Sequence, residues 1–476
     1  MTSIDKLDEP AGRLTAGDGR RALLAAELRE TLTLAAPLAA TQLSLIAMMT
    51  TDLALIGRLG AEAVAGAALG QTVSFMSFMV GMGVVAAVAP LSAQAFGARD
   101  PHLVRRSLRM GLWAALIISI PITGVQFFGE QILLWLGQTP QSSALAKDYL
   151  HGLAWGALPG LVSIALRNFM GAVNRPQPGL WIMLGAVPAN GVLAYALIHG
   201  EFGLPKLGLF GAGLATSIVN LGMAVAAIAI VQWMRPFAKF HLFGHLLSFD
   251  WPRMRKLCVV GFPIAGIMVM EYGVFSAAAL LMGLISTAAI TAHQIALQIA
   301  AIIFMVPLGI GMAATVRVGH AIGRGEPEAV QRAGTVAIAL GALFMAAMTL
   351  GVLIARDGIA GLFLGGGAQD TEASRLTATL LLVGATFFIG DGVQTVAAGT
   401  LRGLNDTRIP MLFAAIGYWA IGFTASCVLA FWLGFGAVGV WIGLSIGTAI
   451  YALALIVRFA LLSRRLRIGV APPRPD

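Results

Sequence analysis

The sequence predicts an all-α polytopic membrane protein, and three observations support that fold class. Of the residues, 58% are hydrophobic and only 11% are charged, whereas about a quarter of a soluble domain is charged. The apolar residues form long unbroken runs rather than the short alternating segments of a membrane β-barrel. The second half of the chain also repeats motifs of the first. We therefore expect twelve transmembrane helices in two six-helix lobes, related by a pseudo-twofold axis along the membrane normal.

The apolar runs have about the 20 residues that a helix needs to cross the hydrocarbon layer. Two of them, the fourth and the tenth, end in polar residues, so their limits are the hardest to place. The twelve predicted segments fall near residues 32–56, 63–90, 104–127, 149–170, 178–199, 208–233, 258–284, 289–315, 331–355, 376–400, 410–432 and 436–460.

The distribution of basic residues predicts the orientation. If the N-terminus is cytoplasmic, 26 of the 31 Lys and Arg lie in cytoplasmic loops and termini, as the positive-inside rule requires. A helix missed or added in mid-chain would destroy this asymmetry, so we expect both termini to be cytoplasmic. Residues 1–30 lack the apolar core of a cleaved signal peptide. The net charge of +9 lies in these loops, which argues against a nucleic-acid partner.

An internal repeat predicts the domain organisation. Gly97-ARDPHLVRR follows the second segment and aligns without gaps with Gly323-RGEPEAVQR after the eighth, at an offset of 226 residues. The same offset pairs Pro37 with Pro263. Because six helices are an even number, both halves have the same orientation. The expected parts are a cytoplasmic N-terminal segment, an N-lobe, a cytoplasmic inter-lobe loop, a C-lobe and a cytoplasmic tail, at residues 1–30, 31–234, 235–256, 257–462 and 463–476.

Three acidic residues lie in apolar segments: Asp52, Glu271 and Asp391. A carboxylate at mid-membrane depth costs about 2.5–3.5 kcal/mol on insertion scales, and such residues usually mark an ion, proton or substrate path. The alternative is a structural hydrogen bond between helices. The repeat offset places apolar Ala278 opposite Asp52 and apolar Leu45 opposite Glu271. Repeat symmetry therefore does not explain these acids, and we expect each lobe to carry its own polar site.

Five short stretches, spread from the first segment to the eleventh, carry a family resemblance. They are Pro37…Asp52-LALIGRLG, Pro90-LSAQAFGA, Ala292-HQIAL, Val316-RVGHAIG and Gly399-TLRGLNDTRIP. In this order, on twelve segments, they resemble the multidrug and toxic compound extrusion (MATE) family, in its bacterial NorM-like branch. The resemblance implies an antiporter of the bacterial inner membrane. It would export amphipathic, often cationic compounds in exchange for inward Na⁺ or H⁺ by alternating access.

The resemblance also implies the coupling residues. Glu271 and Asp391 would form a cation or proton site in the C-lobe, and Asp52 would form one in the N-lobe with Asn190 and Thr216. It implies small-molecule substrates and contact with membrane lipid. It implies no cofactor apart from the coupling ion. We expect a monomer.

Two departures from the family pattern bear on the coupling ion. Relatives often have a second Asn where this chain has Ala194, and some have a Tyr where it has Phe387. Each departure removes an oxygen, and hard cations prefer several oxygen ligands, whereas a proton needs one carboxylate. The departures favour H⁺ and the branch resemblance favours Na⁺. We expect a Na⁺ at Glu271 and Asp391, with H⁺ as the alternative, and no other metal.

Met and aromatic side chains near the C-lobe acids predict the lining of a substrate cavity. Such side chains bind varied flat cations through adaptable packing and cation–π contacts. The alternative is ordinary core packing at helical spacing. The candidate lining residues are Met268, Tyr272, Phe275, Phe387 and Gln394. His293, at the start of the eighth segment, is predicted to have a packing or hydrogen-bonding role.

Other function classes make different predictions. The sequence contains no Gly-Lys pair, so there is no phosphate-binding loop for ATP, and no nucleophile–base set is evident. We therefore do not expect an enzyme. A flippase for a lipid-linked precursor should have a strongly basic cavity, and the loop count leaves no Lys or Arg at mid-membrane depth. A non-transporting sensor or scaffold would not need the three acids for efflux.

Overall fold

A computed structural model describes residues 20–240, 248–364 and 372–469, and these residues form helices and short connections without any strand. Parts of the predicted N-terminal segment, inter-lobe loop and C-terminal tail lie outside the described residues, at 1–19, 241–247 and 470–476. The chain forms two compact units. Their limits fall inside two long helices, α1 (Arg20–Gly57) and α10 (Trp251–Ile285), rather than in loops. Each of these helices contributes residues to both units, and we call them the shared helices.

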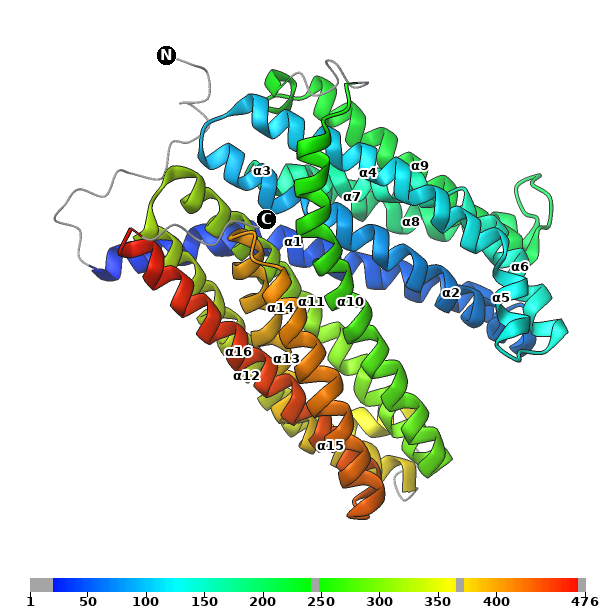
Figure 1. Ribbon diagram of the computed structural model, residues 1–476. Coiled ribbons are helices and arrows are strands. Elements are labelled where there is room, and N and C mark those ends of the chain that lie inside the picture. Colours follow the sequence, from blue (N-terminus) through cyan, green and yellow to red (C-terminus); the bar gives the residue numbers. More distant parts are fainter. Residues whose placement is uncertain (1–19, 241–247, 365–371, 470–476) are drawn as a thin grey trace. The chain divides into compact units, whose positions relative to one another are not determined.

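The first unit runs from Ala40 to Ala265, so it contains the later part of α1 and the beginning of α10. In this unit, α8 and α9 lie side by side (Figure 1). The elements between the two shared helices are α2 (Ala61–Ala86), α3 (Val88–Gly97), α4 (Pro101–Phe127), α5 (Gly129–Trp135), α6 (Pro140–Ala154), α7 (Ala157–Ala172), α8 (Gln177–His199), α9 (Gly208–Trp233) and the short 3₁₀ turn η1 (Phe237–Phe240).

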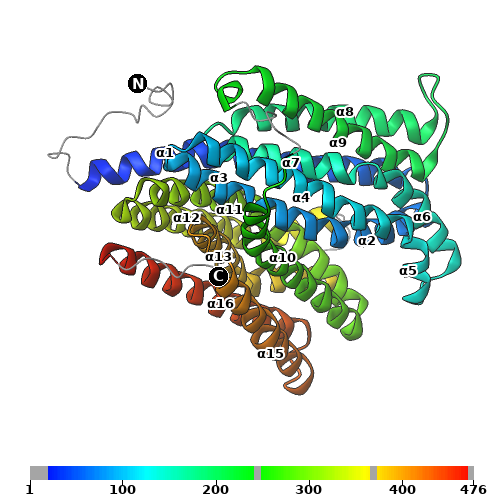
Figure 2. The ribbon, with the colours of Figure 1, turned by 45° about the horizontal axis from the view of Figure 1, so that its top comes forward.

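The second unit contains the described residues up to Ala39 and the chain from Gly266 onward. Here α13 packs against α11, α12 and α16, and Figure 2 shows α12 and α13 together. Its further elements are α11 (Thr287–Arg324), α12 (Pro327–Leu364), α13 (Glu372–Gly403), α14 (Arg408–Ala414), the π-helical segment η2 (Ala415–Phe423), α15 (Thr424–Cys427), the π-helical segment η3 (Val428–Trp432) and α16 (Gly436–Arg467).

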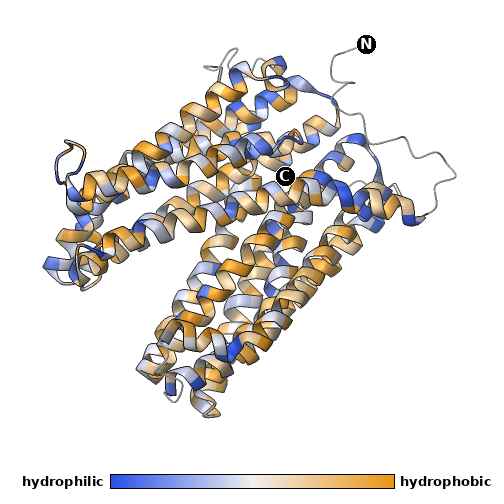
Figure 3. Cartoon of the chain, turned by 180° about the vertical axis from the view of Figure 1, so that it is seen from behind, coloured by the Kyte–Doolittle hydropathy of each residue, from blue (hydrophilic) through white to orange (hydrophobic). Residues whose placement is uncertain are grey.

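The helices confirm the predicted membrane fold. Eleven of those described are long and apolar enough to cross a membrane, and α6 and α7, bent by 50° at the break between them, pass the same test as a pair. This bent pair corresponds to the fourth predicted segment. Its break falls at Trp155 and Gly156, between the two helices. Apolar residues run along the length of the spans, while hydrophilic residues gather mainly near the helix ends (Figure 3).

The repeated loops have the same local structure. Arg99, after α3, and Gly325, after α11, are separated by the repeat offset of 226 residues, and both have left-handed φ values, 55° and 72°. A proline follows two residues later and is the first residue of the next helix, Pro101 in α4 and Pro327 in α12. In the first copy, Asp100 caps α4 by accepting a 2.9 Å hydrogen bond from the backbone N–H of Leu103.

Each shared helix crosses a neighbour at a glycine where no side chain fits. In the first unit, a Cβ atom added to Gly83 of α2 would lie 2.4 Å from the Cα of Ala265 on α10. In the second unit, a Cβ atom added to Gly309 of α11 would lie 2.5 Å from the backbone N of Ala39 on α1. Both glycines and both alanines are related by the repeat offset. The two crossings are therefore equivalent contacts, one in each unit.

The first residues of the shared helices are also held by equivalent arginines. Arg106 of α4 donates from Nε to Asp250, which precedes α10, at 2.6 Å. Its repeat partner, Arg332 of α12, lies 3.4 Å from Glu27 of α1, and Arg317 of α11 donates to Glu27 at 2.7 Å. The Glu27 side chain is only 4% exposed. The beginning of α1 is thus fixed to the second unit and the beginning of α10 to the first.

Candidate functional site

The first-unit site joins one acid to two donors from neighbouring helices. Asn190 of α8 donates from Nδ2 to one carboxylate oxygen of Asp52 on α1. Thr216 of α9 is 3.4 Å from the other carboxylate oxygen, and its hydroxyl also lies 3.3 Å from the carbonyl of Ala212. Asp52 is half-buried and Asn190 is fully buried. The structure therefore brings together the three residues that the family resemblance implies for this site; their role in coupling stays a prediction.

The same site has one buried oxygen without a partner. The Asn190 Oδ1 atom accepts no hydrogen bond from the described residues. Tyr149 of α6 interacts electrostatically with Asp52, a neighbour that the sequence did not suggest. Ala194, one turn after Asn190 on α8, is 1% exposed and packs in the apolar core of this unit. The free amide oxygen can accept a further donor or contact a cation beside the carboxylate.

The second-unit site is built around one amide. Gln394 of α13 donates from Nε2 to Glu271 of α10 at 3.1 Å and to Asp391 at 3.2 Å. The same nitrogen lies 3.0 Å from the hydroxyl of Thr395, which itself donates to the Asp391 carbonyl at 2.9 Å. Asp391 and Gln394 are 6% and 2% exposed. The two acids predicted to act together therefore share one donor, in the interior of the unit.

Three further polar residues surround Glu271, and sequence reasoning did not find them. Arg402 of α13, Tyr418 of η2 and Tyr451 of α16 all interact electrostatically with it. The Tyr418 and Tyr451 rings lie 5.1 Å apart, and neither hydroxyl reaches hydrogen-bond geometry with a described residue. Arg402 follows Asp391 by eleven residues, about three helical turns, and so lies on the same face of α13. That spacing could have revealed it.

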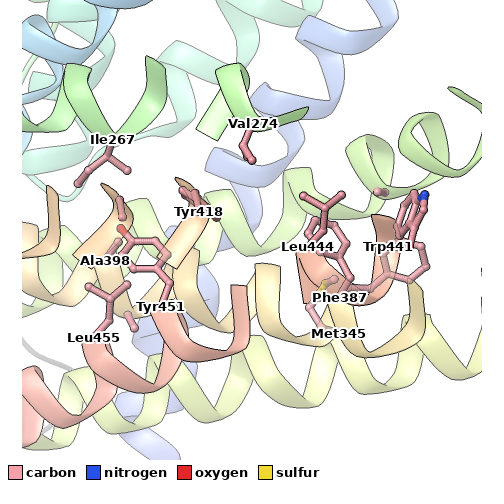
Figure 4. Close-up of a cluster of buried hydrophobic side chains, with 14 of the residues drawn as sticks. Ile267, Val274, Met345, Phe387, Ala398, Tyr418, Trp441, Leu444, Tyr451 and Leu455 are labelled. Atoms are coloured by element: carbon pink, nitrogen blue, oxygen red, sulfur yellow. The ribbon is translucent and has the colours of Figure 1, made fainter. Parts of the chain in front are cut away.

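Of the predicted cavity residues, Phe387 and Gln394 lie in the packed interior. Phe387 is 1% exposed, and its ring lies 5.7 Å from that of Phe275 and 5.5 Å from that of Trp441 (Figure 4). Met268, Tyr272 and Phe275 are half-buried. His293 is fully buried and accepts a 3.2 Å hydrogen bond from the Trp441 indole. This places His293 in an interhelical contact.

The donor set limits what the acids can hold. Within the described residues there is no group of three or more His, Cys, Asp and Glu side chains that could hold a metal ion. A cation at Glu271 and Asp391 would therefore need the neutral oxygens nearby, those of Gln394 and Thr395. The Na⁺ expected there stays a prediction.

Comparison with known proteins shows to which family this chain belongs. The family model described as MatE matches residues 37–196 and 263–428, which include both sets of acids. The chain belongs to the MatE family. A "Probable multidrug resistance protein NorM" of Bradyrhizobium diazoefficiens is 60% identical over 443 residues, 93% of this chain and 95% of that protein. The "Multidrug resistance protein NorM" of Burkholderia vietnamiensis is 39% identical, over 94% of this chain and 96% of its own length.

Solved structures of the family share the fold. The crystal structure of the eukaryotic MATE transporter AtDTX14 matches 94% of this chain with a TM-score of 0.82 at 20% identity, and all of that chain is covered. A structure described as an outward-facing conformation of a multidrug resistance MATE family transporter also has a TM-score of 0.82, at 18% identity, over 93% of this chain and 97% of its own. The predicted NorM-like MATE membership is confirmed.

Proposed function

We propose that this MatE-family chain is a secondary active multidrug efflux antiporter of the bacterial inner membrane, with both termini in the cytoplasm. It exports amphipathic, often cationic compounds and lets Na⁺ or H⁺ run inward by alternating access. The names of the NorM relatives support the drug substrates. The polar sites inside apolar spans support coupling to an ion, because ionisable residues within a membrane span are costly and usually mark an ion, proton or substrate path.

One observation carries the proposal: Glu271 and Asp391 converge on the Gln394 amide. The amide nitrogen has three oxygens around it, from Glu271, Asp391 and Thr395. A cation that displaced the amide group would meet the same three oxygens. A proton would instead neutralise one of the two acids. In either case the bound ion changes the charge of the pair of acids.

Such a change can drive transport only if the ion binds the two conformations with different affinity. Arg402 interacts electrostatically with Glu271 and can compensate the charge of this carboxylate when the ion has left. The site around Asp52 supplies a separate acceptor for a cation or proton in the first unit, with Asn190 and Thr216 as partners. Efflux then needs no ATP and no cofactor.

Substitution of each second-unit acid tests the mechanism. Glu271→Gln and Asp391→Asn should each abolish the efflux of a cationic dye from cells while membrane expression stays at the wild-type level. Glu201→Gln removes an exposed carboxylate in the connection between α8 and α9 and serves as the matched control. Wild-type efflux from either second-unit variant would refute the mechanism, because transport would then not need that carboxylate.

Transport in proteoliposomes identifies the coupling ion. Dye movement is measured with a Na⁺ gradient at constant pH and then with a pH gradient in the absence of Na⁺. Movement driven by the first gradient alone assigns Na⁺, and movement driven by the second alone assigns H⁺. If neither gradient moves the dye through active wild-type protein, antiport of these ions is wrong.

A further inference from the structure

The beginnings of the two shared helices carry opposite charges at equivalent positions. At the repeat offset of 226 residues, Glu27 of α1 corresponds to Arg253 of α10, and Glu30 corresponds to Lys256. In the second unit, Glu27 lies 3.4 Å from Arg332 of α12, so that acid and base are paired there. The exchange of acid for base at two positions one helical turn apart indicates that the first unit holds a different partner at the equivalent place.

This place in the first unit gathers several basic side chains. Arg109 of α4 interacts electrostatically with Arg105 and Arg106 of the same helix. Arg253 of α10 interacts in the same way with Arg106, and Lys256 with Arg253. Each of these interactions joins like charges and is therefore repulsive. We call these five residues, Arg105, Arg106, Arg109, Arg253 and Lys256, the basic cluster.

Two acids interact with the basic cluster, and both already hold other groups. One carboxylate oxygen of Asp250 accepts from Nε of Arg106 at 2.6 Å, and the other accepts from the backbone N–H of Arg253 at 3.3 Å. Asp100 caps α4 by accepting from the backbone N–H of Leu103 at 2.9 Å. Five basic side chains thus face two carboxylates, which leaves an excess of three positive charges.

The neighbouring sequence supplies no further acid to balance this excess. Asp100 is the only acidic residue within 63–129, and Asp250 is the only one within 202–270. Arg109 is nevertheless only 8% exposed, and the buried Nε atom of Arg105 has no acceptor among the described residues. Basic residues that served only to orient the chain could stay in water, whereas buried charges are costly unless they are paired. The missing partner is therefore an anion from outside the first unit.

Exposed aromatic side chains lie beside the basic cluster. Phe249 and Trp251 flank Asp250 and are 43% and 68% exposed. The Phe249 ring lies 5.7 Å from that of Trp113 on α4 and 6.1 Å from that of Trp251. Tryptophan is typical of the boundary between hydrocarbon and water. Because Arg109 precedes Trp113 by four residues, about one helical turn, the basic cluster lies at the depth of the lipid headgroups.

We propose that the basic cluster binds the headgroup phosphate of an anionic membrane lipid. Arginine binds phosphate oxygens through charge-assisted hydrogen bonds, and basic pockets at the ends of membrane helices take anionic headgroups. A bound phosphate joins the beginning of α10 to α4, as Glu27 joins the beginning of α1 to α12 in the second unit. Free phosphate carries the same group, but the exposed aromatic side chains at this depth favour a lipid. No coupling residue takes part, so the site does not depend on the efflux function.

Lipid titration of the purified full-length protein in detergent tests the ligand class. Phosphatidylglycerol, phosphatidylcholine and inorganic phosphate are added in separate series. The unfolding temperature is followed by intrinsic fluorescence, and retained lipid is counted by native mass spectrometry. Phosphatidylglycerol should raise the unfolding temperature and stay bound, while phosphatidylcholine and inorganic phosphate should do neither. Equal effects of the two lipids would overturn the proposal, and so would an inorganic phosphate effect as large as that of phosphatidylglycerol.

A double variant that copies the other repeat tests the position of the site. Arg253→Glu combined with Lys256→Glu installs the acids that α1 carries at the equivalent positions. The new carboxylates can pair with the arginines of α4, as Glu27 pairs with Arg332, so the fold should be retained. The affinity for phosphatidylglycerol should fall about tenfold or more, as expected for the loss of one charge-assisted hydrogen bond. Wild-type affinity in the double variant would overturn the proposal.

Two single variants separate this site from a general attraction of basic residues for the lipid. Arg255→Gln removes an exposed arginine of the same helical turn whose repeat equivalent, Arg29, is also an arginine, and the affinity should stay at the wild-type level. Lys256→Gln removes one charge without adding an acid and should weaken binding a few-fold. A loss in Arg255→Gln as large as that in the double variant would mean that any nearby positive charge attracts the lipid, and would overturn the assignment to the basic cluster.

Discussion

The glycine crossing of α1 and α11 gives the sharpest stability prediction. An added Cβ atom at Gly309 would lie 2.5, 2.6 and 2.7 Å from the N, Cα and Cβ atoms of Ala39. Ordinary contacts of a Cβ atom begin at 3.4 Å, so in Gly309→Ala the two helices must separate by about 1 Å. The neighbouring atoms belong mainly to the backbone and cannot turn away. Overpacking of this kind typically costs about 1–3 kcal/mol.

The intrinsic preference of alanine for helices opposes this cost. Replacing glycine by alanine inside a helix gains up to about 1 kcal/mol. Gly222→Ala in α9, where nothing lies within 4 Å of an added Cβ, isolates that gain and should raise the unfolding temperature. Gly309→Ala should lower it, and so should Gly83→Ala, whose added Cβ would lie 2.4 Å from the Ala265 Cα. The same direction of change in all three variants would refute the steric reasoning.

The assay is thermal unfolding of purified protein in one detergent, followed by intrinsic fluorescence, with dye efflux from cells as a second measurement. Valine at position 309 adds two further carbon atoms and should lower the unfolding temperature more than alanine does. A larger effect of alanine than of valine would contradict a contact that depends on side-chain volume. Unchanged unfolding temperatures in both would show that α1 and α11 do not pack as closely as the structure has them.

Three other outcomes follow from the polar contacts. Among the described residues, Asn190→Ala leaves Asp52 with the Thr216 hydroxyl as its one side-chain hydrogen-bond donor. Cation efflux should therefore fall about tenfold, the effect of one lost charge-assisted hydrogen bond. Unchanged initial rates of dye efflux would exclude a role for this amide. Gln394→Leu removes the donor shared by two acids, so efflux should fall. Gln394→Glu should change the ion dependence of efflux. A rate in proteoliposomes equal to that of wild type for the leucine variant would contradict the bridging role. Glu27→Gln leaves Arg317 and Arg332 with a weaker partner and should lower the free energy of unfolding by about 2 kcal/mol. An unchanged midpoint of chemical unfolding in detergent would contradict this.

The membrane fold could be predicted because its causes are local. Span length, loop charge and the repeated loop at Gly97 and Gly323 are all properties of short stretches of sequence. The bend in the fourth span was not predicted, because a hydropathy pattern does not register the change of direction at Trp155 and Gly156. The helix ends were also predicted too short, since α1 begins at Arg20 and α12 reaches Leu364.

The candidate sites could be predicted only in part. Single acids in apolar runs are visible in a sequence, and Asp52, Glu271 and Asp391 stood out for that reason. Arg402 did not, because α13 continues past the predicted end of its span and carries the arginine inward, toward Glu271. Arg167 lay inside the fourth predicted span, but its charge was counted with the cytoplasmic loop that follows. A charge near the end of a span can belong to a loop or to the interior, and only the direction of the side chain decides.

The two shared helices also determine how the chain can be divided. A cut in the connection between α9 and α10 would leave the N-terminal fragment with the first residues of α1, which pack in the second unit, and without the beginning of α10, which packs in the first. Neither fragment would be self-contained, and each would complete the other, as in a swapped dimer.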